Sequence, residues 1–401
     1  MLLKDILRTL IPILIQTRLR VKRYNKWNEI FIVALTPICI YNALTSIENG
    51  FEPRYLNGPL NFVYAVGIFV VSMKSLDIAL TSRHEIVYVG LNNERHTEAL
   101  LDVGRDLGWE GTFAQLVNLR GVGWKWGLTL DKLPQVYRHN FLKSVLKEVI
   151  IHHILSNITV SILVLGMHNH DSLFRAIGYD NPSAQAEFFG DIIRTIVLGT
   201  AAWSGLSLGY HLLALAVYLI YKLFGLNFNN LSWPALLSHH VFTLDSVSSF
   251  WSQHWHFIFR RQFIILGYKP LYNLGSYLGS KNISRCFGII GAFAVSGLMH
   301  EYGIRHAILT ADQPSTYPSF TFFLISAFAI IAEYVFHFLT GKKVNGNFGR
   351  IWAWSVLILS GIPMTQHWLD KGRLGYIDHP STWSLSQILT PFGFLFSKKS
   401  H

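Results

Sequence analysis

The chain of 401 residues is 51% hydrophobic and 14% charged, whereas an average soluble protein carries roughly 25% charged residues. Long apolar blocks exclude a soluble globular chain, 57 aromatic residues exclude a disordered one, and two cysteines, Cys39 and Cys286, exclude a disulfide scaffold. A net charge of +11 would suggest nucleic acid for a soluble chain, but here it indicates the basic loops of a polytopic membrane protein, and no nucleic-acid partner is expected.

Residues 1–27 predict a basic segment that lies at the membrane surface. The apolar stretch from Ile6 to Ile15 is short, and it is interrupted by Arg8 and Pro12. Five cations follow it, namely Arg18, Arg20, Lys22, Arg23 and Lys26. This order favours an interfacial helix with a basic face over a cleavable signal peptide.

Eight apolar segments follow that could cross a membrane, because a spanning helix needs about 20 mostly apolar residues. They are 28–45, 61–80, 149–167, 192–222, 286–304, 318–340, 351–367 and 383–397. The segment 192–222 has the length of one tilted helix or of a helix and a half, and small residues in its middle would permit a break. We predict an all-α protein of about eight transmembrane helices, with one membrane domain over residues 28–397.

The loop charges predict the orientation of these helices. With 192–222 as one crossing, residues 1–27 hold seven Lys and Arg and residues 81–148 hold nine. The loops on the opposite side hold few cations; they are 46–60, 168–191, 305–317 and 368–382. Because cytoplasmic loops accumulate Lys and Arg, we predict that both termini and the loops 81–148 and 223–285 are cytoplasmic.

The C-terminus, residues 398–401, ends with two lysines followed by Ser400 and His401. Lys398 and Lys399 are placed as in the dilysine signal that returns proteins to the endoplasmic reticulum, an address that a receptor reads. Two lysines also suit any cytoplasmic end, so this alternative stays open. The expected location is the endoplasmic reticulum membrane.

The first candidate site is the segment 249–261, in which aromatic side chains alternate with polar ones. An aromatic belt at headgroup depth would explain its tryptophans. It would not explain His254 and His256 two residues apart, followed by Arg260 and Arg261. We therefore favour a functional role for this segment and keep the belt as the alternative.

The second candidate is His300, near the end of the span 286–304. An ionisable side chain inside a span is a functional candidate by default. Ser296 lies four residues before it and shares its helical face, whereas Glu301 points elsewhere. Glycines 291, 297 and 303 give this helix a surface for close neighbours or for a substrate. The alternative is a histidine that only packs within the bundle.

Other polar residues at membrane depth have simpler explanations. Lys74 and Asp77, three apart, most simply neutralise one another, and Glu333 and His337, four apart, form a structural pair. As a proton relay, the same residues would suit a proton-coupled secondary transporter, but the repeats and broken helices typical of transporters are missing from the sequence. An intramembrane terpene cyclase would depend on Glu333 as its acid.

The histidine pairs do not predict a metal site. The three groups, His152 with His153, His239 with His240, and His254 with His256, lack the His-x-x-His-His and His-x-x-x-His spacings of membrane di-iron enzymes. No metal and no permanently bound cofactor is expected.

Two motifs together resemble a known family. The loop motif Phe250-Trp251-x-x-x-Trp255-His256 and the span motif Ser296-Gly297-x-x-His300-Glu301 are similar to the wax-synthase-like branch of the membrane-bound O-acyltransferase (MBOAT) superfamily, with its fungal members nearest. The tract from Asn118 to Trp124 resembles an Arg-Gly-Ile-Gly-Trp stretch of those members. The likeness covers roughly residues 115–370. Ser252, Gln253 and His254 stand where the family usually has Gly-Arg-Arg.

The resemblance implies an MBOAT-like core with a central intramembrane reaction chamber, and an acyl-CoA-dependent O-acyltransferase. Its co-substrate would be acyl-CoA, with acetyl-CoA preferred. Its acceptor would be a hydroxyl of an apolar molecule from the membrane, such as a terpenoid or another secondary metabolite. The alternative is a wax ester synthase that uses long-chain alcohols.

The resemblance also implies roles for single residues. His300 would be the general base, since histidine's ordinary pKa of about 6.5 suits this task. His256 would bind near the thioester or donate to its oxyanion. The predicted residues of the coenzyme A site are Trp255, Arg260, Arg261 and Lys269, and the cations among them would meet phosphates.

Overall fold

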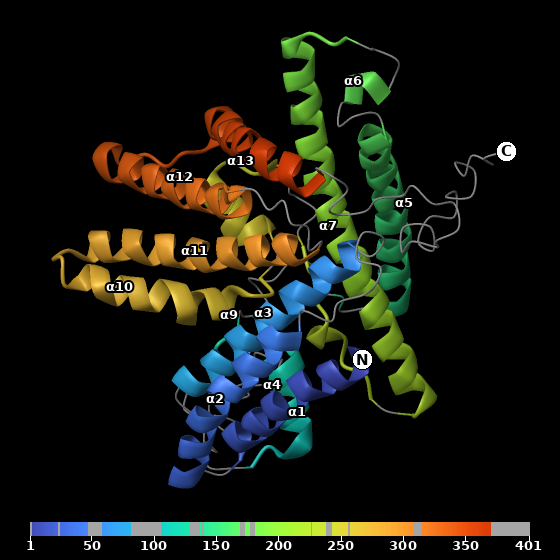
Figure 1. Ribbon diagram of the computed structural model, residues 1–401, viewed down its shortest axis with the longest axis vertical. Helices are drawn as coiled ribbons and strands as arrows, with labels where there is room; N and C mark the ends of the chain where they lie inside the picture. Colours follow the sequence, from blue (N-terminus) through green and yellow to red (C-terminus); the bar gives the residue numbers. More distant parts are fainter. Residues whose placement is uncertain are drawn as a thin grey trace. The chain divides into compact units, whose positions relative to one another are not determined.

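The computed structural model describes residues 2–22, 25–46, 58–81, 106–127, 137, 140–168, 173–176, 181–225, 227–237, 243–255, 257–307 and 315–369. Over these ranges the chain is built from helices joined by turns, without a strand (Figure 1). The predicted all-α class is therefore confirmed. The predicted span 383–397 and the residues 398–401 lie outside the described ranges.

Six helices of the described chain are long and apolar enough to cross a membrane. They are α2 (Lys26–Ser46), α3 (Gly58–Leu80), α5 (Phe141–His168), α7 (Ala184–Leu223), α11 (Lys281–Ala307) and α12 (Pro318–Thr340). Each contains one predicted span. The predicted span 351–367 lies within the helix α13 (Gly346–Leu369), which is not one of the six. The predicted count of eight is thus not confirmed.

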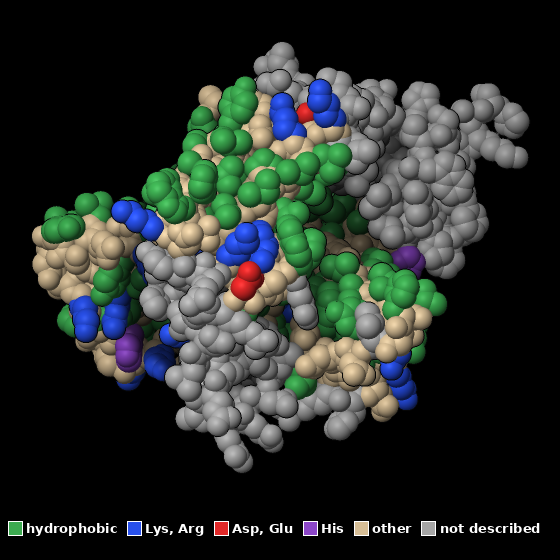
Figure 2. Space-filling model, turned by 90° about the horizontal axis from the view of Figure 1, so that it is seen from below, with side chains coloured by type: hydrophobic (Ala, Val, Ile, Leu, Met, Phe, Trp, Pro, Cys, Tyr) green, Lys and Arg blue, Asp and Glu red, His purple; other side chains and the backbone are tan. Residues whose placement is uncertain are grey.

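Large apolar side chains stand exposed along these helices. Ile150 of α5 is 59% exposed and Phe338 of α12 is 69% exposed. Hydrophobic side chains also form several patches on the face in Figure 2. Soluble proteins rarely expose so much apolar surface, whereas a bilayer accepts it and requires the backbone to be satisfied within helices. The chain is a multi-pass membrane protein.

The chain divides into two compact units. Unit 1 comprises Met1–Phe51, Leu60–Leu133 and Phe257–Ile331, and unit 2 comprises Glu52–Pro59, Pro134–His256 and Ala332–His401. The boundary between 331 and 332 falls within α12. Each unit is described by itself below.

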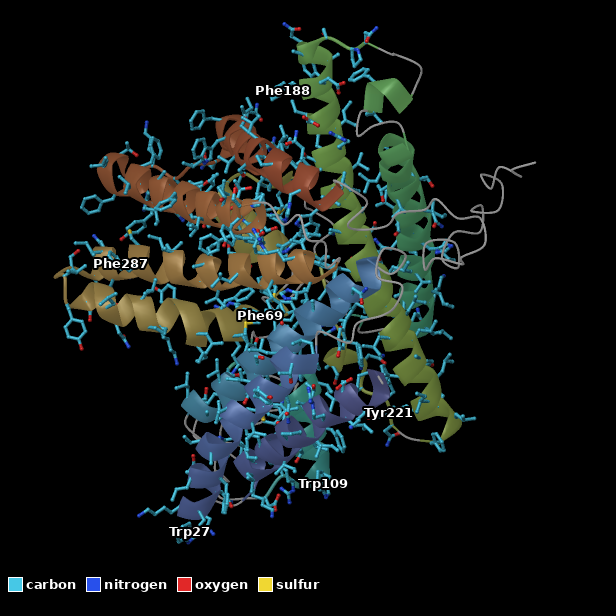
Figure 3. All side chains as sticks on the ribbon, in the orientation of Figure 1. Trp27, Phe69, Trp109, Phe188, Tyr221 and Phe287 are labelled. Carbon is cyan, nitrogen blue, oxygen red and sulfur yellow. The ribbon has the colours of Figure 1, made fainter. Side chains whose placement is uncertain are left out.

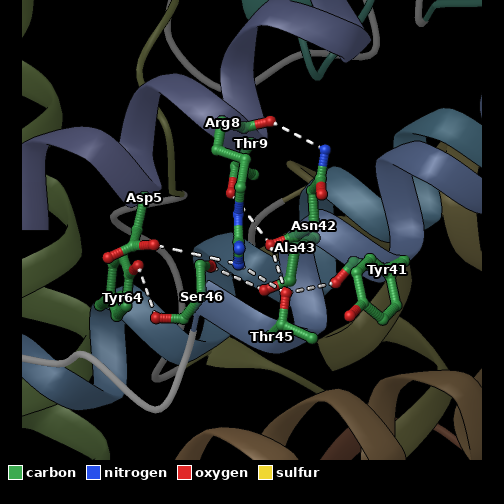
Figure 4. Close-up of polar contacts among 9 residues, drawn as sticks. All are labelled: Asp5, Arg8, Thr9, Tyr41, Asn42, Ala43, Thr45, Ser46 and Tyr64. Atoms are coloured by element: carbon green, nitrogen blue, oxygen red, sulfur yellow. Dashed lines mark hydrogen bonds and ion pairs between the residues drawn. The ribbon is translucent and has the colours of Figure 1, made fainter.

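In unit 1 the first helix, α1 (Leu2–Val21), packs against α2 through polar contacts. Figure 4 shows one group of them, in which Arg8 donates to Thr45 Oγ1 at 2.6 Å and Asn42 donates to the Arg8 carbonyl at 3.2 Å. Further along α1 the buried Gln16 amide donates to the carbonyl of Ile32 at 3.1 Å. The predicted surface segment is thus a helix with a polar face that is bonded to its neighbour. A further short helix, α4 (Gly108–Val117), also contacts α1.

Residues 260–276 form a nearly continuous helical stretch, which we call the arm. It consists of α9 (Arg260–Phe263), the π-helical η8 (Ile264–Tyr268) and α10 (Lys269–Ser276), and it runs antiparallel to α11 (Figure 1). A Cβ at Gly267 would lie 2.2 Å from the Gly291 carbonyl oxygen, and one at Gly291 would lie 2.2 Å from that of Gly267. Both positions therefore require glycine. The sequence predicted only a loop here, because Arg, Gln, Lys and Asn interrupt the apolar run.

In unit 2, α7 is one unbroken helix of 40 residues, paired with α5 and contacted by α13. The predicted alternative of a broken pair is wrong, and a Cβ added at Gly205 or Gly209 would meet nothing within 4 Å. At 1.5 Å per residue α7 is about 60 Å long, twice the thickness of the hydrocarbon core. The remaining elements of unit 2 are short: α6 (Leu173–Ala176), η5 (Asn230–Ser232), α8 (Val247–Ser249) and η7 (Phe250–His254).

Candidate active site

The predicted site residues fall in both units. Four of them belong to unit 1: His300 lies on α11, and the arm carries Arg260, Arg261 and Lys269. Trp255 follows η7 in unit 2, and His256 lies outside the described residues.

The imidazole of His300 is fixed on two sides. Its Nδ1 lies 2.8 Å from the carbonyl oxygen of Ser296, and its ring stacks on Phe323 of α12 with centroids 4.5 Å apart. A carbonyl oxygen only accepts, so Nδ1 must carry the proton and the neutral ring has its lone pair on Nε2. The expected partner residue is therefore correct, but the contact is with its backbone.

Glycines bring two neighbouring helices close to α11. A Cβ at Gly297 would lie 3.0 Å from the Cα of Phe320 in α12, and one at Gly303 would lie 2.8 Å from the Val66 side chain in α3. The side chain of Phe69, labelled in Figure 3, packs against Tyr302 with ring centroids 5.4 Å apart. The predicted close-packing surface of this helix is confirmed.

The described hydrogen bonds of Glu301 do not include the His300 ring. This agrees with its place on the helix, which predicts that it points elsewhere. One carboxylate oxygen accepts the backbone N–H of Ser319 at 2.9 Å and that of Phe320 at 3.3 Å, both in the first turn of α12. The other accepts from Arg305 Nε at 2.9 Å. Glu301 therefore caps α12 and fixes the helix whose Phe323 supports the histidine ring.

The aromatic loop, residues 246–255 of unit 2, forms a compact turn of helix. Ser246 caps α8 and Ser249 completes a capping box. In η7, the ring of Phe250 contacts Trp251 at 4.9 Å and Trp255 at 5.5 Å between centroids, and the two tryptophans lie 6.1 Å apart. Phe250 itself is buried. These contacts give the aromatic residues of the motif a common packing role.

Glu333 holds the start of this loop. Its carboxylate accepts the N–H of Val247 at 2.7 Å, the N–H of Ser248 at 3.0 Å and the indole N–H of Trp352 at 3.0 Å. The predicted pair with His337 is not among the described contacts of Glu333, and His337 is exposed. The sequence could not reveal this role, because 86 residues separate Glu333 from Val247.

Arg261 is buried in an ion pair. Its Nε lies 3.0 and 2.8 Å from the two carboxylate oxygens of Asp77, and another of its nitrogens donates to Thr81 at 3.0 Å. Its guanidinium lies 4.7 Å from the ring centroid of Trp126. Arg261 is 6% exposed. Phosphate binding by Arg261 would require it to leave these partners, and this role stays a prediction.

Asp77 makes its direct ion pair with Arg261 rather than with Lys74. Lys74 is 2% exposed, makes no hydrogen bond and lies 5.7 Å from the ring of Trp126. Trp126 itself closes a tight turn on Gly121, whose φ is +68° and whose added Cβ would lie 2.4 Å from the indole. The glycine-rich tract thus presents an indole to two cations, a contact that the motif did not predict.

The other two predicted phosphate ligands lie at the surface. Arg260 and Lys269 are both exposed on the arm, one at its first residue and one at the start of α10. Their positions are compatible with the predicted contact to coenzyme A phosphates.

A further polar cluster lies between α5 and α7. His211 contacts the hydroxyl of Tyr137 at 2.8 Å and the carbonyl of Ser207 at 2.6 Å, and His152 lies 3.4 Å from Glu148. Glu148 and His152 are four apart, a spacing that could have indicated their pairing. Within the described chain, no group of three or more His, Cys, Asp or Glu could hold a metal ion.

A comparison with family models matches residues 233–325 to the membrane bound O-acyl transferase family. The matched stretch contains the aromatic loop, the arm and His300 on α11. The match supports membership of the MBOAT superfamily and, with it, membrane O-acyltransferase activity. Comparisons with curated proteins and with solved structures found no match.

Proposed function

We propose that the protein is an acyl-CoA-dependent O-acyltransferase that transfers an acyl group, preferentially acetyl, to a hydroxyl of an apolar acceptor. The observation that carries the proposal is the fixed tautomer of His300, inside the stretch that matches the family. A neutral imidazole with its lone pair on Nε2 is the form that a general base for an alcohol needs. The wax-synthase-like branch is the part of the superfamily to which we assign the chain.

In the proposed reaction, His300 Nε2 takes the proton of the acceptor hydroxyl as its oxygen attacks the thioester carbonyl carbon. The tetrahedral intermediate collapses, the carbon–sulfur bond breaks, and the sulfur leaves with the proton that His300 returns. The products are an ester and coenzyme A. His256 would donate to the oxyanion, and a single such donor is worth about 10²- to 10³-fold in rate.

The cations of the arm would bind the donor. Arg260 and Lys269 are exposed and supply charged donors for coenzyme A phosphates. Arg261 would position the arm through Asp77 unless a bound phosphate releases it. Trp255, by the resemblance to the family, would also contact coenzyme A.

The acceptor would enter from the bilayer. The apolar surface of the spans favours a lipophilic alcohol, and we propose a hydroxylated terpenoid or another secondary metabolite. Long-chain alcohols, which would make the protein a wax ester synthase, are the alternative. The proposed location is the endoplasmic reticulum membrane with both termini cytoplasmic.

The test compares His300→Ala with His306→Ala in the full-length protein in nanodiscs. His306 is a matched control, since its Nδ1 lies 2.8 Å from the Tyr302 carbonyl, the same local bond on the same helix. We expect His300→Ala to lower kcat by about 10²- to 10⁴-fold and His306→Ala to change it little. Equal activity of both variants and the wild type would overturn the base assignment.

The substrates are tested by supplying radiolabelled acetyl-CoA or palmitoyl-CoA with a terpenoid alcohol or hexadecanol. Ester formed mainly from acetyl-CoA and the terpenoid supports the proposal. Ester formed mainly from hexadecanol would identify a wax ester synthase. Absence of any ester from a folded protein would overturn acyl transfer.

A further inference from the structure

A polar chamber lies in unit 2, where α5 begins and the chain leaves α7. Its volume is about 540 Å³. Two cations, Lys143 and Lys222, and two amides, Asn140 and Asn230, line it, and none of the described lining residues carries a carboxylate. Tyr221, labelled in Figure 3, lies at this end of α7. The composition of the chamber predicts an anionic ligand, because its donors include two ammonium groups and two amide NH₂ groups.

The floor of the chamber is aromatic and packed. The ring centroids of Phe141, Tyr218 and Phe228 lie 4.8 to 5.5 Å apart. Lys222 is held over the Tyr218 ring, with Nζ 5.7 Å from the centroid. Lys222 is exposed, and its ammonium lies within cation–π distance of the floor.

The backbone at the mouth of the chamber is unusual. Asn140 has φ of +50°, the sole positive value at a described residue other than glycine. Its carbonyl accepts the N–H of Ser144 at 3.0 Å, which begins α5. Asn tolerates this left-handed conformation, which here places Asn140 directly before α5.

An open apolar strip on one face of α5 continues from the chamber, and we call it the groove. It shares Leu142 and Lys143 with the chamber and extends past Leu146 to Ile150 and Ile151. From Lys143 to Ile151 the helix rises by about 12 Å. Lys147 adds an apolar stem to the groove wall and can raise its ammonium toward the headgroup level.

We propose that the chamber and groove together bind one anionic glycerophospholipid, with its phosphate between Lys143 and Lys222 and an acyl chain along the groove. The groove lies on the exposed side of a candidate span, where Ile150 faces outward, so its neighbours are bilayer lipids. The charge pattern of the sequence predicts this end as cytoplasmic, the side on which membranes carry anionic lipids. The proposal does not depend on acyl transfer.

The test uses native mass spectrometry of the full-length protein in detergent, titrated with dioleoylphosphatidylserine or dioleoylphosphatidylcholine. We expect the wild type to retain the serine lipid at least fivefold better. Lys143→Gln and Lys222→Gln should each lower this preference, and the double variant should abolish it. The control is Lys281→Gln, an exposed cation that begins another span outside the groove.

Equal retention of the two lipids by the wild type would overturn the proposal, as would an unchanged preference in a folded double variant or an equal loss in Lys281→Gln. Displacement of the phospholipid by one equivalent of palmitoyl-CoA would also overturn it, because the site would then belong to an acyl donor. If the double variant does not fold, salt provides the measurement: the wild-type preference must fall as ionic strength rises from 0.1 to 1 M, where the screening length shrinks from about 10 to 3 Å.

Discussion

Two buried glutamates, Glu301 in unit 1 and Glu333 in unit 2, each accept two backbone N–H groups from the start of another helix. Glu301 caps α12 through Ser319 and Phe320, and Glu333 caps α8 through Val247. Glu301 thereby fixes the helix that supports His300, and Glu333 fixes the aromatic loop.

The two carboxylates differ in their third partner. Glu301 has a cation, Arg305, whereas Glu333 has the neutral indole N–H of Trp352, and no ion pair involves Glu333 among the described residues. Backbone and indole donors alone can stabilise a buried carboxylate when several of them converge. The comparison teaches that the cation in unit 1 adds a second function: Arg305 also donates to the Thr316 carbonyl and stacks on Tyr317, which orders the turn before α12.

The largest expected effect comes from Glu333→Ala. The change leaves three donors without their acceptor, and each buried donor left unpaired costs about 1–3 kcal/mol. Because water will satisfy part of this loss, we expect a fall of about 3 kcal/mol in the free energy of unfolding. Thermal unfolding of the detergent-solubilised protein measures it.

The matched control for that change is His337→Ala, one turn further along α12 and exposed. We expect a change within about 0.5 kcal/mol, as for most surface positions. Equal destabilisation by the two variants would mean that the Glu333 contacts do not hold the loop.

A smaller effect is expected from Arg305→Met, which keeps the apolar stem and removes the charge. The Glu301 carboxylate would then have the two backbone N–H groups as its donors. Glu333 has the same kind of donors plus the indole N–H of Trp352. We expect a loss of about 1–2 kcal/mol, and a coupling of at least about 0.5 kcal/mol between Arg305→Met and Glu301→Gln in a double-mutant cycle. Arg350→Met, in an exposed part of α13, is the control. If the effects of Arg305→Met and Glu301→Gln on the free energy of unfolding are additive, the ion pair does not stabilise the protein.

The smallest effect is expected for the exposed pair of Arg18 and Asp106, which contrasts with both buried carboxylates. The guanidinium of Arg18, 2.6 Å away, lowers the pKa of Asp106 to about 2. A lowered carboxyl pKa stabilises the fold above the unfolded value of about 4, and this stabilisation is lost as pH falls from about 4 to about 2.

Because the side chain of Asp106 is 41% exposed, solvent screens the pair and we expect less than about 1 kcal/mol from it. Asp106→Asn should remove the acid-dependent part of stability between these pH values, and 1 M salt should do the same in the wild type. A pH profile identical in the variant and the wild type would show that this pair contributes nothing measurable.

The sequence predicted the helices that depend on a continuous apolar run, and it predicted that His300 and Glu301 serve different faces of α11. These features follow from local periodicity. It could not predict partners that are distant in the chain. Arg261 lies 184 residues from Asp77, and it binds that carboxylate where Lys74 was expected.

The physical reason for this difference is geometric. Spacing along a helix shows which side chains can meet. It does not show that the planar guanidinium of Arg261 makes two bonds to Asp77 and a third to Thr81. The ammonium of Lys74 does not make these three bonds. The arm was missed for a related reason. Its polar residues lower its hydropathy, while Gly267 and Gly291 provide a close helix contact that hydropathy does not measure.

The glycine contact between the arm and α11 also bears on how the chain assembles during synthesis. The two helices are consecutive in the sequence, so their contact closes a short loop and requires no distant segment. We expect the arm and α11 to associate as a helical hairpin soon after both have left the ribosome. A bulky side chain at Gly267 would then act on the newly made protein before the remaining helices exist, and it would appear as lost yield and increased degradation rather than as altered turnover.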